Sequence, residues 1–170
     1  MRPTGICRFI LFPLVSIATT ACGGTDRSGD AGNNTLEKLT ARSLGEQLII
    51  SNAEHLASAE YSSTDAAWGE RLAMQCRACH SLEANGANMI GPALYGFFGK
   101  KSASVSGYPY SQALAEAEFV WTPRALDAWL AQPADFLPGN KMTFAGLGKA
   151  ADRRAVVAYL LELTDDAVAN

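Results

Sequence analysis

Residues 76–80 are Cys76-Arg77-Ala78-Cys79-His80, and this stretch decides the fold. A C-x-x-C-H run in an exported protein is typical of covalent attachment of a c-type haem. Two thiols on one turn each bond a vinyl group of the porphyrin, and the next residue presents an imidazole to the iron. A thioredoxin-like redox pair is disfavoured because no βαβ pattern surrounds the run. Half of a zinc site is disfavoured because the mature chain offers no second C-x-x-C pair.

Length and charge limit what the chain can be. Its 170 residues allow one small domain and an additional segment. The formal net charge of −3 argues against nucleic acid as a partner. Residues 22–65 hold seven acidic and three basic side chains, whereas residues 66–170 hold ten and nine and are nearly neutral. Two of the four cysteines belong to the C-x-x-C-H run, so no disulfide framework is expected.

Residues 1–21 are predicted to be a secretory signal peptide. Arg2 and Arg8 give a basic start, and residues 9–18 form an apolar run that is too short for a membrane span. Cys22 follows small residues, as in the lipobox of bacterial lipoproteins, which predicts a lipid anchor at Cys22 on the periplasmic side of a bacterial membrane. The alternative is ordinary cleavage, which would leave a free thiol on a soluble periplasmic protein.

Residues 22–65 are predicted to be a flexible linker, because residues 22–35 are mostly small and polar. Residues 36–60 carry apolar side chains at loosely helical spacing, which indicates a possible marginal helix lying on the head or on a partner. His55 lies in this part of the chain. It is expected to be exposed to solvent rather than to serve as a second iron ligand.

Residues 66–170 are predicted to form an all-α domain. A helix is expected to run into the C-x-x-C-H motif, and Gly69 within it indicates the close approach of a second helix. Thr122 and Pro123 suit the N-cap and first position of another helix. Residues 155–163 predict a last helix with an apolar face.

Two loops outside these helices carry further chemistry. Residues 91–99 place three glycines and a proline among large apolar side chains, which predicts a fixed loop that can wall a large hydrophobic ligand. Met142 follows Pro-Gly and is well placed to bring a thioether to a metal, although methionine is also a common core filler. Met74 and Met89 are its rivals. Met74 lies too near the C-x-x-C-H run to reach the opposite haem face, and Met89 is in a loop near the proximal side.

Taken together, residues 66–163 resemble the class I cytochromes c of the mitochondrial and α-proteobacterial type. The resemblance rests on an ordered set of motifs: the helix with Gly69, C-x-x-C-H, G-P-x-L-x-G-x-x-G, the Trp-centred helix start, P-G-x-K-M and the final Ala-Tyr-Leu helix. It implies a small all-α fold wrapped around one covalent haem c, with the first and last helices crossing.

The resemblance also implies roles for individual residues. Cys76 and Cys79 would bond the haem, and His80 and Met142 would be the two axial ligands of its iron. The carbonyl of Pro92 would orient His80 through the other ring nitrogen. The inner propionate would be bonded by Tyr110 and Trp121. The chain departs from the family pattern at Ala73, Tyr95, Lys100, Leu114, Trp129 and Asn140; in particular, Trp129 stands where the family has a tyrosine that bonds the methionine sulfur.

A haem with both axial positions filled has no open site for a substrate, so the resemblance implies a one-electron carrier rather than an enzyme. The implied partners are a cytochrome bc-type quinol-oxidising complex and a terminal oxidase or other redox acceptor, with the carrier itself a monomer. Lys100, Lys101 and Lys141 would form a docking rim around the exposed haem edge. Two alternatives stay open: a haem subunit of a dehydrogenase, and a haem peroxidase or sensor in which Met142 leaves the iron.

Overall fold

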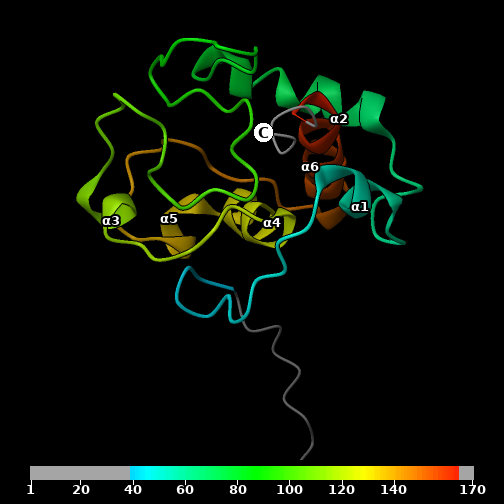
Figure 1. Cartoon of the computed structure of the whole chain (residues 1–170), viewed down its shortest axis with the longest axis horizontal. Coiled ribbons are helices and arrows are strands. Elements are labelled where there is room, and N and C mark those ends of the chain that lie inside the picture. Colours follow the sequence, from blue (N-terminus) through cyan, green and yellow to red (C-terminus); the bar gives the residue numbers. More distant parts are fainter. Residues whose placement is uncertain (1–38, 165–170) are drawn as a thin grey trace, which may run out of the picture. The chain divides into compact units, whose positions relative to one another are not determined.

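The computed structural model describes residues 39–164, and its elements are short helices joined by long loops (Figure 1). In chain order they are α1 (Asn52–Ala57), α2 (Ala66–Ala73), the 3₁₀ turn η1 (Cys76–Ala78), α3 (Gln112–Ala115), α4 (Pro123–Ala131), α5 (Pro133–Phe136) and α6 (Ala150–Leu163). Within residues 39–164 there is no β-strand, and extended pairing is limited to an isolated antiparallel bridge between Lys101 and Val120. The predicted all-α class is confirmed.

Helices α2 and α6 cross in contact, as predicted from Gly69. Asp65 caps α2 by accepting a hydrogen bond from the backbone N–H of Trp68 at 2.9 Å. A Cβ at Gly69 would overlap the carbonyl oxygen of Ala155 and would lie 3.0 Å from the Cβ of Tyr159. Glycine costs about 1 kcal/mol relative to alanine inside a helix. The packing of α2 on α6 offsets that cost, because only glycine allows this approach.

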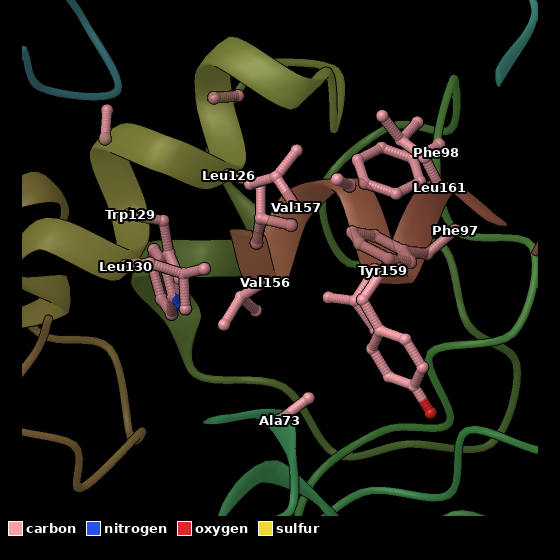
Figure 2. Close-up of a cluster of buried hydrophobic side chains, with 14 of the residues drawn as sticks. Ala73, Phe97, Phe98, Leu126, Trp129, Leu130, Val156, Val157, Tyr159 and Leu161 are labelled. Carbon is pink, nitrogen blue, oxygen red and sulfur yellow. The ribbon is translucent and has the colours of Figure 1, made fainter. Parts of the chain in front are cut away.

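The hydrophobic core is built mainly from α6 and α4. Val156, Val157 and Leu161 of α6 are almost completely buried. They belong to the same buried cluster as Leu126 and Trp129 of α4, and the side chains of the two helices meet in Figure 2. The side chain of Thr122 caps α4 by accepting a hydrogen bond from the N–H of Ala125. Pro123 is the first residue of the helix, as the sequence predicts.

Four aromatic rings close a cycle of edge-to-face contacts within this core. Phe119 meets Trp121 at 4.8 Å between centroids, Trp121 meets Trp129 at 5.4 Å, Trp129 meets Phe136 at 5.7 Å, and Phe136 returns to Phe119 at 5.5 Å. Perpendicular rings at such distances attract each other through their quadrupoles. The cycle therefore fixes the orientation of both indoles, which line a large cavity.

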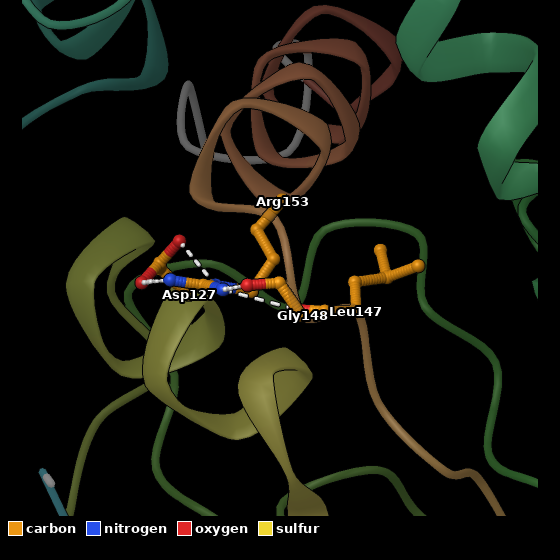
Figure 3. A network of polar contacts seen from close by, with 4 residues as sticks. All are labelled: Asp127, Leu147, Gly148 and Arg153. Atoms are coloured by element: carbon orange, nitrogen blue, oxygen red, sulfur yellow. Dashed lines mark hydrogen bonds and ion pairs between the residues drawn. The ribbon is translucent and has the colours of Figure 1, made fainter.

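An ion pair joins α4 to α6, and its arginine also bonds the loop between α5 and α6. Arg153 donates from Nε to Oδ1 of Asp127 at 2.9 Å and from Nη2 to Oδ2 at 3.3 Å. The same guanidinium donates from Nη1 to the carbonyls of Leu147 and Gly148, at 2.9 and 3.2 Å (Figure 3). This side chain fixes the end of the loop that carries Met142.

Residues 39–65 pack on the helical domain, which corrects the prediction of a flexible linker over residues 22–65. Asn52 is only 1% exposed and donates from Nδ2 to the carbonyl of Leu161 and to Oγ1 of Thr164, each at 3.2 Å. Both acceptors lie at the end of α6. The sequence pattern missed this packing because the apolar residues of the segment do not form one buried stripe: Leu44 and Tyr61 are buried, whereas Leu48 and Ile49 are exposed.

Other residues of the segment make equally specific contacts. Leu44 and Tyr61 are buried members of the core cluster. Gln47 donates from Nε2 to the carbonyl of Val120 at 2.6 Å, and its Oε1 accepts from the N–H of Val120 at 2.9 Å. The helix expected somewhere within residues 36–60 is limited, in the described part, to the six residues of α1.

The predicted signal peptide (1–21), Cys22 and the remaining linker residues up to 38 lie outside the described residues. Between residues 39 and 164, no helix combines the length and the apolar character needed to cross a membrane. The described chain ends at Thr164, directly after α6.

Candidate haem site

A large, mostly apolar cavity opens between η1, the loops that follow it, and helices α4 and α6. Its walls come from segments far apart in the sequence, so the tertiary fold is needed to assemble it. Most of the residues that the sequence singles out lie around it together: Cys76, Cys79, His80, Pro92, Tyr110, Trp121, Lys141 and Met142.

The C-x-x-C-H run forms a tight turn at the edge of this cavity. The carbonyl of Cys76 accepts hydrogen bonds from the N–H groups of Cys79 at 3.0 Å and of His80 at 2.9 Å. Both thiols are free and half-buried. Burial raises the pKa of the Cys76 thiol, so it stays protonated. The turn thus presents two thiols and an imidazole to one cavity.

His80 is held in one orientation by the loop that follows it. Its Nδ1 lies 2.7 Å from the carbonyl oxygen of Pro92, which only accepts, so Nδ1 carries the proton and Nε2 keeps its lone pair. A Cβ at Gly91 would overlap the imidazole ring, so glycine is required where the loop backbone crosses it. Burial lowers the pKa of His80 and outweighs the opposing effect of the Pro92 hydrogen bond. A neutral imidazole with a free Nε2 is the form that binds metals.

Met142 reaches the same cavity from the loop between α5 and α6. Its backbone N–H donates to Oδ1 of Asn140 at 2.9 Å. Nδ2 of Asn140 donates in turn to the carbonyls of Pro133 and Leu137, at 2.9 and 2.8 Å. Asn140 therefore braces the backbone directly before Met142. The rival methionines, Met74 and Met89, are 60% and 49% exposed, and the cavity lining does not include them.

The sulfur of Met142 accepts a hydrogen bond from the indole of Trp129. Nε1 of Trp129 lies 3.1 Å from Sδ. The resemblance implies that Trp129 stands where the family has a tyrosine, but the sequence does not show that the indole delivers an N–H to the same sulfur. The roles of Asn140 and Trp129 were missed for this reason: both depend on contacts across the fold.

The remaining predicted residues divide into two groups. Tyr110 and Trp121 line the cavity, and the hydroxyl of Tyr110 accepts from the N–H of Val105 at 3.3 Å. Lys141 also lines it. Lys100 and Lys101 are exposed, and the cavity lining does not include them.

The donor set around this cavity suits one covalently bound haem. Two neighbouring thiols match two vinyl groups, an oriented imidazole and a thioether match the two axial positions of iron, and the apolar walls match a porphyrin. A helical domain with this site defines a c-type haem protein.

Comparisons with known proteins agree with this class. The pattern of the family described as cytochrome c matches residues 66–164. A cytochrome c of Gibberella zeae is 43% identical over 90 residues, which cover 53% of this chain and 85% of that protein. Cytochrome c2 iso-2 of Magnetospirillum fulvum is 46% identical over 88 residues, covering 52% and 91%. The cytochrome c-type cyt cy of Rhodobacter capsulatus is 44% identical over 91 residues, covering 54% and 45%.

The chain belongs to the cytochrome c family. This confirms the predicted resemblance, the all-α haem-binding fold and covalent haem c as the cofactor. It also makes the chain a haem-based electron carrier.

Proposed function

We propose that this chain carries single electrons on a haem c whose iron is held by His80 and Met142. It exchanges them with a cytochrome bc-type quinol-oxidising complex and with a terminal oxidase or other redox acceptor of a respiratory or photosynthetic chain. The observation that supports this most directly is that His80 and Met142 line the same apolar cavity as the two cysteines.

The bound haem supplies a reversible one-electron couple. Cys76 and Cys79 would hold the haem through two thioether bonds, each made by adding an S–H across a vinyl group, which would consume no oxidant. His80 offers Nε2 while the Pro92 carbonyl holds its Nδ1–H, and such an outer hydrogen bond fixes the ring and strengthens the ligand. Tyr110 and Trp121 line the cavity and are proposed to bond the haem propionate.

Met142 is proposed to stay bound, which favours a carrier over a peroxidase or sensor. Its backbone is braced by Asn140 and its sulfur accepts a hydrogen bond from Trp129, and both contacts favour the position of the side chain in the cavity. An axial thioether favours the reduced state of the haem, and the apolar cavity acts in the same direction because burial penalises the additional charge of the ferric form.

Substitution of Met142 tests the ligand assignment. Met142→Ala is expected to open the iron to carbon monoxide and to lower the reduction potential, because it removes the thioether that favours the reduced state. Met74→Ala and Met89→Ala are the matched controls and should do neither, since both side chains are exposed. If Met89→Ala opened the iron and Met142→Ala did not, the assignment would be wrong.

We also propose that Cys22 carries a lipid that holds the protein at the periplasmic face of a bacterial membrane. Because residues from 39 onward pack on the domain, the proposed tether is limited to the 16 residues of the predicted linker from 23 to 38. A flexible chain of 16 residues spans about 20–24 Å. Such a reach favours partners in the same membrane, by raising their effective concentration.

The mass of the mature N-terminus tests the anchor. A lipid-modified Cys22 is expected, and Cys22→Ser should move the protein to the soluble fraction without changing the haem spectrum. An unmodified Cys22, or a mature chain that starts elsewhere, would leave the protein as a soluble periplasmic carrier.

A further inference from the structure

The haem cavity is bordered by segments with almost no charge. Residues 84–99 and 102–115 contain no Asp, Glu, Lys or Arg, and residues 137–148 contain only Lys141. These three segments supply more than half of the residues that line the cavity. The surface next to the haem is therefore built from the neutral part of the sequence.

Two large apolar side chains are exposed on this border. Ile90 lines the cavity and is nevertheless 76% exposed, the highest value among the exposed large apolar side chains of residues 39–164. Its neighbour Met89 is 49% exposed. Val105 and Tyr108 are half-buried residues of the facing loop, and both line the cavity. Clustered apolar groups left in water at a functional opening mark an interaction surface.

The two loops that carry these residues are tied together, so the surface has a fixed shape. The hydroxyl of Tyr108 donates to the carbonyl of Ile90 at 2.6 Å. Nδ2 of Asn88 donates to the carbonyl of Ser106 at 3.0 Å. A surface that is already ordered loses little conformational entropy when a partner binds.

We propose that Met89, Ile90, Val105 and Tyr108, here termed the neutral rim, form the docking surface for a redox partner whose own contact face is apolar and uncharged. The proposal rests on the electron-carrier function proposed above and specifies the chemistry of its partner. Electrons would pass where the partner covers the mouth of the haem cavity, and the neutral rim would lose its contact with water.

The distribution of cations supports a neutral partner over an acidic one. Lys141 is the one charged residue in the cavity lining, and its Nζ lies 3.3 and 3.4 Å from the carbonyls of Pro109 and Tyr110. Arg77 is paired with Glu83 at 2.8 Å. An acidic docking face would thus meet a single lysine here, whereas an apolar face would match the exposed Ile90 and Met89.

Electron transfer to native membranes tests the proposal. The full-length holoprotein is reduced with ascorbate and mixed either with the membrane fraction of the cells that produce it or with ferricyanide, a small oxidant that needs no docking surface. The rate with membranes divided by the rate with ferricyanide is compared among wild type, Met89→Ser/Ile90→Ser and Lys141→Gln. Leu48→Ser/Ile49→Ser is the matched control, because it removes a similarly exposed apolar pair that does not line the cavity.

The expected result is a ratio that falls about fivefold or more in Met89→Ser/Ile90→Ser, the size of effect typical of a central contact residue, and that stays unchanged in Leu48→Ser/Ile49→Ser. The wild-type rate with membranes should change less than about twofold between 0.01 M and 0.15 M salt, over which the screening length falls from about 30 Å to about 8 Å.

Two results would overturn the neutral rim. One is a ratio in Met89→Ser/Ile90→Ser that stays near the wild-type value. The other is a steep fall of the rate with rising salt together with a lower rate ratio in Lys141→Gln. That result would assign docking to the lysine rim of Lys100, Lys101 and Lys141. A wild-type protein that reduces ferricyanide but transfers no electrons to membranes would instead contradict the carrier function. The proposed docking surface would then be contradicted as well.

Discussion

Asn52 offers the sharpest test of the finding that residues 39–65 belong to the folded domain. Its Nδ2 donates to the carbonyl of Leu161, which lies in the last turn of α6, where carbonyls lack intrahelical donors. Thr164 is the second acceptor, and its hydroxyl also donates to the carbonyl of Leu160 at 2.7 Å. Asn52 therefore completes the C-terminal cap of α6 from outside the helix.

The cost of Asn52→Ala follows from these contacts. Thr164 keeps its bond to Leu160, but the buried carbonyl of Leu161 loses the Asn52 donor. An unsatisfied buried acceptor costs about 1–3 kcal/mol. We therefore expect the free energy of unfolding to fall by about 2 kcal/mol. At about 4 °C per kcal/mol for a domain of this size, the melting temperature should fall by about 8 °C.

Thermal and guanidinium unfolding of the holoprotein, followed by circular dichroism, measure this change. The covalent haem stays on the chain throughout, so its loss does not complicate the transition. Ser62→Ala, in the same segment but on an exposed side chain, is the control and should melt with the wild type. A melting curve of Asn52→Ala that overlays the control would refute the reasoning and would restore residues 39–65 to the role of a linker.

Two further substitutions test the haem cavity and the helix crossing. Trp129→Phe removes the hydrogen bond of about 1 kcal/mol that draws electron density from the Met142 sulfur. The reduction potential should therefore fall by a few tens of mV. A redox titration with an unchanged midpoint would count against this prediction. Gly69→Ala should destabilise the protein by at least about 2 kcal/mol in guanidinium unfolding, since its Cβ would overlap the Ala155 carbonyl. Gly148→Ala, where a Cβ meets nothing within 4 Å, is its control, and equal stability of the two variants would contradict the close crossing of α2 and α6.

The parts of the fold that the sequence predicts well are those determined by local chemistry. Thr122 and Pro123 start α4 because a hydroxyl cap and a fixed φ act within one turn of the chain. Gly69 predicts the helix crossing because a glycine inside a helix needs a compensating contact. The C-x-x-C-H run likewise carries its two thiols and its imidazole on one short turn.

The parts that the sequence does not predict depend on contacts between distant residues. The apolar residues of segment 39–65 are only loosely periodic, and the polar contacts that fix the segment are isolated: Asn52 is buried at the end of α6, and Gln47 pairs with Val120. Neither residue type signals burial, and neither belongs to a periodic pattern. Only the fold brings their partners within reach, which is why the predicted linker extended to residue 65.

Trp129 shows why a departure from a family pattern has to be judged by atoms rather than by residue names. Replacing a tyrosine removes a hydroxyl, and from the sequence this leaves the proposed ligand sulfur without a donor. In the fold, the indole is held by edge contacts with Trp121 and Phe136, and Nε1 reaches the sulfur of Met142 at 3.1 Å. Asn140 braces the backbone of Met142, and Trp129 is the donor at its sulfur. The replacement therefore keeps a hydrogen bond to sulfur while changing its chemical nature from O–H to N–H, so its effect should be found in the strength of iron ligation and not in the identity of the ligand.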